Sequence, residues 1–143
     1  MTTENEGLIR RWFEEVWNQG MTSTIDALLD EGAVVHGLGA DLHGPDDFKT
    51  FHAMYRSAFP DMVIQVDDVA VDGPRVAARW SGTATHRGEL MGIPPTGRRV
   101  TFTGMVFIHV ERGKVVEGWN NFDQFGLLLQ LGAVTQPGAA VAS

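Results

Sequence analysis

The second half of the chain constrains the fold most, because four long strand-like segments follow one another there with only short breaks. They span residues 62–71, 76–86, 98–110 and 114–122, and the first carries an irregularity at Asp67-Asp68. Turn residues occur at Asp72-Gly73-Pro74 and Glu111-Arg112-Gly113. Consecutive strands of this kind predict an antiparallel sheet that is long enough to curl strongly.

The first half of the chain is helical. Apolar residues recur at helical spacing over 4–18, 22–30 and 46–58, and a short strand is expected at 33–36. Pro60 stops the third helix. Helices followed by strands predict an α+β fold. We expect a cone-shaped fold, in which the strongly curved antiparallel sheet and the three N-terminal helices enclose a pocket.

A single domain is expected over residues 1–132, because 143 residues fit one core and neither a repeat nor a linker is visible. Within it, a short helix is predicted at 125–131. Residues 133–143 are expected to form a disordered tail, since the chain ends in small residues from Pro137 to Ser143.

Charge and composition exclude several classes of function. The net charge is −7 and no basic stripe is present, so nucleic acid is not an expected partner. The absence of cysteine excludes disulfides, cysteine-ligated metals and a thiol nucleophile. No apolar run reaches the ~20 residues that cross a bilayer, and the polar N-terminus does not resemble a signal peptide. A cytoplasmic protein without a membrane partner is therefore expected.

Asp123 is the first candidate for chemistry. It follows the aromatic-rich strand end Trp119-Asn120-Asn121-Phe122, and a carboxylate buried at such a place is costly unless it is paired or neutral. Burial also moves the pKa of a carboxyl group towards the range that suits proton transfer. Asp123 is therefore interpreted as a pocket acid/base, with a cap of the helix at 125–131 as the alternative.

Four segments, taken together in this order and spacing, resemble the SnoaL-like polyketide cyclase family from about residue 8 to 132. They are 80–88 (Trp-Ser-Gly-Thr-Ala-Thr-His-Arg-Gly), 90–99 (Leu-Met-Gly-Ile-Pro-Pro-Thr-Gly-Arg-Arg), 113–117 with Trp119 and Asp123, and the ending Gln130-Leu131-Gly132.

The resemblance implies the nuclear-transport-factor-two-like cone fold, dimerisation through the outer sheet face, and catalysis without a metal or organic cofactor. In the characterised cyclases, the aspartate that matches Asp123 is the general acid/base of an intramolecular aldol closure. Those cyclases add a histidine and a glutamine on the third strand. The corresponding stretch here, 103–107 (Thr-Gly-Met-Val-Phe), has no polar pair, which weakens the expectation of aldol chemistry more than that of fold.

Three histidines are further candidates. His52 lies on the apolar stripe of the third helix and either polarises a substrate carbonyl or is a core residue bonded to a neighbour. His36 ends the short strand, where the cyclases place a polar pocket residue, and is either catalytic or solvated. His86 shares a strand face with Trp80 and either contacts substrate or holds the following loop. No histidine pair has helical metal-site spacing, so no metal is expected.

The predicted substrate-binding wall contains His86 and four larger side chains, Tyr55, Trp80, Met105 and Trp119. An aromatic-lined cavity suits a flat, apolar, polyketide-like molecule. We therefore expect a cofactor-independent enzyme that acts on a small apolar carbonyl compound, by aldol cyclisation or a related isomerisation. Epoxide or ester hydrolysis in the same pocket, a non-catalytic binding protein and a structural dimerisation domain remain open.

Overall fold

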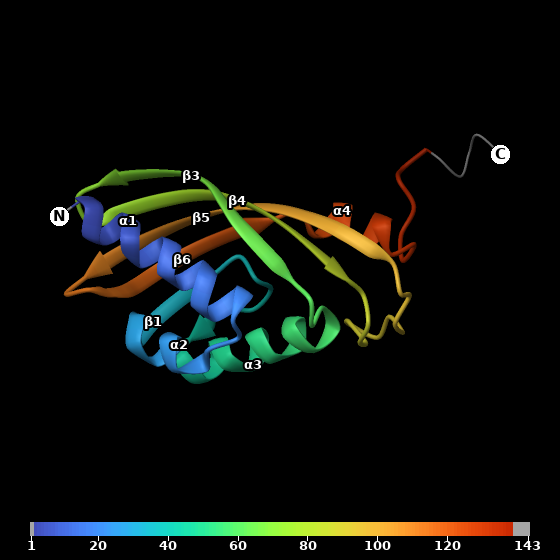
Figure 1. Ribbon diagram of the computed structural model, residues 1–143, viewed down its shortest axis with the longest axis horizontal. Helices are drawn as coiled ribbons and strands as arrows, with labels where there is room; N and C mark the ends of the chain where they lie inside the picture. Colours follow the sequence, from blue (N-terminus) through green and yellow to red (C-terminus); the bar gives the residue numbers. More distant parts are fainter. Residues whose placement is uncertain (1, 139–143) are drawn as a thin grey trace.

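The computed structural model describes residues 2–138 and shows a curved sheet with helices across one face (Figure 1). The α+β prediction is confirmed. The elements in chain order are α1 (Thr2–Arg11), η1 (Trp12–Asn18), α2 (Thr22–Leu28), β1 (Leu29–His36), β2 (Leu42–His43), α3 (Gly44–Ala58), β3 (Val63–Asp72), β4 (Arg75–Thr85), β5 (Arg99–Glu111), β6 (Lys114–Phe122) and α4 (Gln124–Gln130).

The sheet has the strand order β2-β1-β6-β5-β4-β3. The four long strands pair as antiparallel neighbours, as predicted. β1 pairs with β6 in parallel, with Val35 opposite Gly118, so the sheet as a whole is mixed. A parallel neighbour requires a long connection rather than a hairpin. The chain between β1 and β6 supplies this long connection, because it contains α3 and the long strands β3, β4 and β5.

The register of the strand pairing shifts at several places in the sheet. The irregularity expected at Asp67-Asp68 is confirmed by a shift between Val66 and Asp68 in the β3–β4 pairing. A second shift lies between His109 and Val110 in the β5–β6 pairing. An extra residue of this kind bends a strand and increases its twist, which turns the inner face of the sheet towards the helices.

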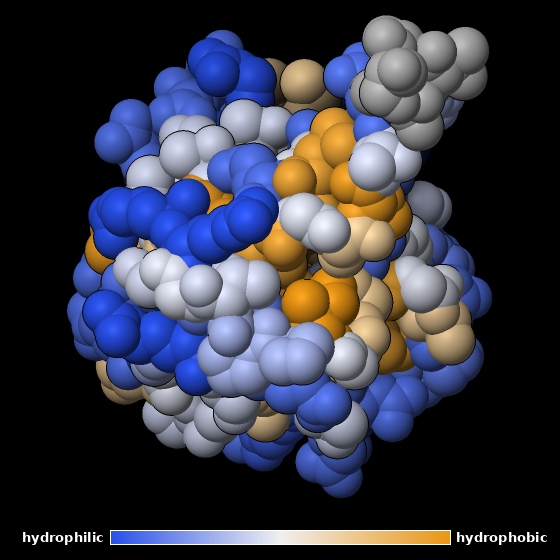
Figure 2. Space-filling view, turned by 90° about the vertical axis from the view of Figure 1, so that its right-hand side faces the viewer, coloured by the Kyte–Doolittle hydropathy of each residue, from blue (hydrophilic) through white to orange (hydrophobic). Residues whose placement is uncertain are grey.

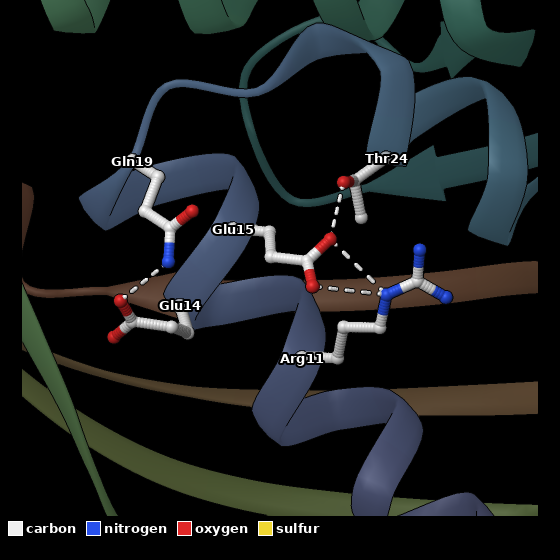
Figure 3. A network of polar contacts seen from close by, with 5 residues as sticks. All are labelled: Arg11, Glu14, Glu15, Gln19 and Thr24. Carbon is white, nitrogen blue, oxygen red and sulfur yellow. Dashed lines mark hydrogen bonds and ion pairs between the residues drawn. The ribbon is translucent and has the colours of Figure 1, made fainter.

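The first predicted helix forms as one helical stretch, but its second part, η1, has π-helical geometry. Polar contacts tie this part to α2 (Figure 3). The buried Thr24 hydroxyl donates to Glu15 at 2.6 Å, and Arg11 donates to the same carboxylate at 3.1 Å. Gln19 donates to Glu14 at 3.0 Å. Of these contacts, the one between Thr24 and Glu15 joins η1 to α2.

The helices bury their apolar faces against the inner face of the sheet. From η1 these are Trp12, Phe13, Val16 and Trp17, and the buried residues of α3 include Phe48 and Tyr55. After α4, residues 133–138 contain neither helix nor strand, and the rest of the expected disordered tail, 139–143, lies outside the described residues.

Candidate active site

An apolar cavity of about 90 Å³ lies between the helices and the inner face of the sheet. Each layer contributes aromatic side chains to its wall, among them Trp12 from η1, Phe51 and Tyr55 from α3, and Phe102 and Phe122 from β5 and β6. Edge-to-face contacts order these rings, such as Trp12 on Phe48 with centroids 5.0 Å apart and Tyr55 on Phe122 at 5.9 Å. The cavity therefore has a rigid, aromatic wall.

Uncharged hydrogen-bonding groups interrupt this wall. Tyr55 contributes a hydroxyl and Asn120 an amide. Burial raises the pKa of Tyr55, so its hydroxyl stays protonated at neutral pH. Trp80 also lines the cavity, and its buried indole N–H has no partner within the described chain. The hydroxyl and the amide are suited to receive ligand oxygen atoms, because both groups donate hydrogen bonds.

Asp123 does not lie in the cavity wall, so the prediction of a buried pocket carboxylate is corrected. Its side chain is exposed, and its Oδ1 accepts a hydrogen bond from the Gly126 backbone N–H at 2.9 Å. This is an N-cap of α4, the alternative that the sequence left open. The preceding residue, Phe122, does line the cavity, which places Asp123 directly after a wall residue rather than within the wall.

His52 is buried, as its place on the apolar stripe predicted, but it does not reach the cavity. Its Nε2 donates to the backbone carbonyl of Val16 at 2.7 Å, and its ring packs on Trp17 with centroids 4.9 Å apart. Burial lowers the pKa of His52, although the bond to Val16 opposes that shift. His52 thus joins α3 to η1 as a neutral core residue.

His36 also lies outside the wall. Its Nε2 and Nδ1 contact two carboxylates, Glu117 at 2.7 Å and Asp41 at 3.0 Å. The ring stacks on Trp119 with centroids 5.5 Å apart. Hydrogen bonds to Glu117 and Asp41 raise the pKa of His36. The catalytic interpretation lacks support from this position, because β6 directs Glu117 and Trp119 to the outer face while Gly118 and Asn120 line the cavity.

His86 is fully buried and anchors the loop between β4 and β5. It does not line the cavity. Its Nδ1 accepts from the Thr96 backbone N–H at 3.1 Å, and the ring packs on Phe59 at 5.5 Å. Backbone contacts complete the attachment, because Gly97 donates to the His86 carbonyl at 2.8 Å. The predicted substrate contact of His86 is therefore replaced by the alternative interpretation, a residue that anchors a loop.

Two of the four larger predicted wall residues, Tyr55 and Trp80, do line the cavity, and their contact with substrate stays a prediction. Met105 and Trp119 do not line it. Their exposed fractions are 61% and 40%, because both occupy outward positions of β5 and β6. Asn120 was missed. The alternation of side-chain directions along β6 was the signal that could have identified it. That alternation places the polar Asn120 inside and its apolar neighbour Trp119 outside.

Candidate metal ligands do not cluster in the described structure. Within residues 2–138 no group of three or more histidine, aspartate or glutamate side chains is arranged to hold a metal ion. No helix in the same part of the chain is long and apolar enough to cross a membrane.

Comparisons with known proteins agree with this architecture. The model of a family described as SnoaL-like polyketide cyclase matches residues 7–131. Aklanonic acid methyl ester cyclase DnrD from Streptomyces peucetius is 29% identical over 131 residues, which cover 87% of this chain and 88% of that protein. Nogalonic acid methyl ester cyclase from Streptomyces nogalater is 28% identical over 125 residues, covering 81% of this chain and 89% of its own. The structure of AclR, a candidate hydroxylase from Streptomyces galilaeus, has a TM-score of 0.86 at 29% identity and covers 99% of this chain and 93% of its own.

Proposed function

The chain belongs to the SnoaL-like polyketide cyclase family, and we propose that it closes a ring in a small apolar carbonyl compound by cofactor-independent acid/base chemistry. The observation that carries this proposal is the aromatic cavity whose polar groups are uncharged hydrogen-bond donors. Two relatives named as cyclases of aklanonic acid methyl ester and nogalonic acid methyl ester support a methyl ester as the substrate class.

The proposed reaction is an intramolecular aldol addition. A base removes a proton from the carbon next to one carbonyl group, and the resulting enolate carbon attacks a second carbonyl of the same molecule. A carbon–carbon bond forms, the second carbonyl oxygen becomes an alkoxide, and this oxygen takes up a proton. The product is an isomer of the substrate, so the reaction consumes no oxidant, reductant or water.

The cavity serves this reaction in two ways. Its rigid aromatic wall favours a folded substrate over an extended one, which brings the two reacting carbons together. Tyr55 and Asn120 line the wall, and each carries a group that can donate a hydrogen bond to a carbonyl oxygen. Such donors stabilise the negative charge that develops on that oxygen as the proton is removed.

We assign the base to Asp123. Among the residues that line the cavity in the described structure there is no aspartate, glutamate or histidine, so a base must act from the rim. Asp123 follows the wall residue Phe122 directly, and only its Oδ1 is engaged, with Gly126. Its Oδ2 is the atom that would accept the proton.

Replacement of Asp123 by Asn tests the assignment, because Asn caps a helix as well as Asp does but is not a base. With aklanonic acid methyl ester as the substrate, D123N is expected to lose roughly 100-fold or more of the turnover. The ring-closed isomer is followed by chromatography, with the unfolding temperature of each variant as the control. Full turnover by D123N would remove Asp123 from the mechanism. Conversion to the free acid with release of methanol would indicate an ester hydrolase instead.

A non-catalytic ligand-binding protein is the second candidate. It is favoured by the same lack of acidic and histidine side chains in the cavity wall of the described residues. It predicts that the ester binds without conversion and that D123N binds it as tightly as the unaltered protein. Calorimetry combined with product analysis separates the two candidates.

A homodimer through the outer sheet face is also proposed. Three large apolar side chains are exposed there, Met105 (61%), Phe107 (41%) and Trp119 (40%). Phe107 and Trp119 pack edge to face with centroids 5.8 Å apart, which makes a continuous apolar surface. Sedimentation should show a dimer that M105S/F107S dissociates, and a monomeric unaltered protein would contradict the proposal.

A further inference from the structure

We propose that Leu38 closes the cavity to ligands of ring size, and that His36 is a positioning residue that holds Leu38 there by binding Asp41. Leu38 lies in the loop 37–41 between β1 and β2, which is called the flap below. A ligand enters when the flap moves away. The inference rests on the proposed function only in that the cavity binds an apolar ligand, whether or not the protein converts it.

The opening of the cavity lies beside the flap. Most of the described wall residues are buried, and those that are partly exposed are Leu38, Phe51, Asn120 and Phe122. These residues are neighbours. A Cβ at Gly37 of the flap would collide with the Asn120 carbonyl oxygen, and Tyr55 packs on both Phe51 and Phe122, with centroids 4.9 and 5.9 Å apart. The flap, α3 and the end of β6 therefore frame the opening.

The position of β6 shows which side of the molecule carries the opening. β1 and β6 run parallel, so the flap follows β1 at the same end of the sheet at which β6 ends and α4 begins. Figure 2 shows apolar surface gathered on the side that carries α4. An apolar ligand thus meets apolar surface on the side from which it would enter.

The cavity is too small for an aromatic ring while the flap is in place. Its volume is about 90 Å³. An engineered apolar cavity that binds benzene measures about 150 Å³. Part of the wall must therefore move before a ring can enter.

Leu38 is the part of the wall that moves most easily. Helices and strands hold the other described wall residues through their backbones, apart from Met62, which is buried. Leu38 is only half-buried, and the glycines on either side of it both have positive φ, +92° at Gly37 and +96° at Gly39. A Cβ at Gly39 would have nothing within 4 Å. The backbone can therefore rotate at Gly39 without meeting a neighbour.

His36 joins the two ends of the flap and ties them to β6. Its Nδ1 contacts the Asp41 carboxylate at 3.0 Å, and its Nε2 contacts the Glu117 carboxylate at 2.7 Å. Ionised carboxylates only accept hydrogen bonds, so both ring nitrogens must carry a proton if the two bonds are to coexist. Neutral His36 has one N–H and keeps one bond. We expect it to keep the shorter one, to Glu117, and to release Asp41 and the flap.

Other titratable groups near this edge of the sheet do not contact His36. His109 of β5 is opposite Glu117 in the β5–β6 pairing, and His43 of β2 is opposite Val34 of β1. The His43 backbone N–H donates to Asp47 of α3 at 2.8 Å. Within the described structure, the carboxylates that bond the His36 ring are those of Asp41 and Glu117. His43 and His109 therefore provide controls for the titration of His36.

The test measures the affinity for phenol by isothermal titration calorimetry. Phenol binds the protein only when the flap is open, so a change that raises the open fraction tightens binding by the same factor. L38A removes the side chain that closes the cavity and is expected to lower the Kd roughly tenfold. D41A removes the exposed partner of His36 and is expected to lower the Kd roughly threefold. Damage to the fold would weaken binding instead.

Matched controls replace residues of the same type that do not belong to the flap. L42A alters a leucine of β2 that is also half-buried but does not line the cavity. D72A alters an exposed aspartate at the end of β3. Neither variant is expected to change the Kd for phenol.

The pH dependence of binding separates the role of His36 from that of an ordinary structural contact. The unaltered protein should bind phenol more tightly as the pH rises from 6 to 8, because His36 loses its proton and releases Asp41. H36Q should lack this dependence, whereas H43Q and H109Q should retain it. D41A, at an exposed position, should also lack it and provides a second variant should H36Q unfold.

Four results would overturn the proposal: weaker phenol binding by L38A, no binding by either L38A or the unaltered protein, an affinity of the unaltered protein that does not vary with pH, or a pH dependence that persists in D41A. Turnover by D123N bears on the catalytic assignment alone, and the affinities of the flap variants bear on the flap alone.

Discussion

The carboxylate of Asp123 and the backbone N–H of Gly126 form the cap of α4, with a donor–acceptor distance of 2.9 Å. A side chain at position 126 would collide with that carboxylate, because the Asp123 oxygens occupy the space into which a Cβ would project. The glycine therefore permits the cap, and the cap holds the carboxylate in place directly after the wall residue Phe122. The proposed base thus also has a structural contact.

Asp123 variants should separate these two roles in stability measurements. D123A removes the cap and is expected to lower the free energy of unfolding by about 1 kcal/mol, whereas D123N should change it by less than about half of that. Urea unfolding followed by tryptophan fluorescence measures both. If D123A were as stable as the unaltered protein, the cap would contribute nothing to the fold.

His52 should make the protein less stable as the pH falls below the ordinary histidine pKa of 6.5. Burial lowers the pKa of His52 in the folded state, so the unfolded chain binds the proton more tightly. Stability is then lost as the pH decreases from 6.5 towards the folded pKa. H52Q, which keeps an N–H for the Val16 carbonyl but does not titrate, should show a smaller decline between pH 7 and 5. An identical decline in both proteins would exclude His52 as the cause.

His36 should act in the opposite direction. Its pKa is raised by hydrogen bonds to Glu117 and Asp41, so the folded state holds the proton more tightly than the unfolded chain. The stabilisation is complete below pH 6.5 and disappears as the pH rises through the folded pKa. H36Q should remove that loss, which thermal unfolding between pH 6 and 8 measures. H43Q, at an exposed histidine of β2, serves as the control and should behave as the unaltered protein.

The sequence predicted the long strands well and the direction of their side chains poorly. The segment 114–122 coincides with β6, because its turn residues and alternating pattern mark both ends. Trp119 was nevertheless placed inside and Asn120 was overlooked, since apolar residues usually face a core. Here the polar Asn120 lines the cavity and Trp119 lies outside against His36. The prediction assumed that apolar residues face the core. A polar residue in a cavity wall and an apolar residue on the outer face are both exceptions to that assumption.

The histidines show a related limit. The apolar stripe of the third helix correctly predicted that His52 is buried, but not that its partner would be the carbonyl of Val16, 36 residues earlier. β2 was not predicted, because two residues are too few to form a pattern. Local periodicity identifies which residues are buried, whereas partners distant in the sequence depend on how the elements pack.

Replacement of Gly104 by a residue with a side chain should destabilise the protein, because the Trp80 ring lies against this glycine. The two residues are directly opposite in the β4–β5 pairing, and the indole lies across the glycine where a Cβ would project. G104A must displace the Trp80 ring, which is part of the cavity wall, and is expected to cost about 1–3 kcal/mol of stability. The same shift should weaken binding of phenol in the cavity.

Gly118 provides the matched control for this experiment. It lines the same cavity from β6, but a Cβ there would meet its nearest neighbour, Ile108, at an ordinary 3.5 Å. G118A should therefore unfold at a urea concentration at or above that of the unaltered protein, since alanine is less costly to order than glycine. Equal stability of G104A and G118A would show that Trp80 moves aside without cost and that the wall of the cavity is not rigid.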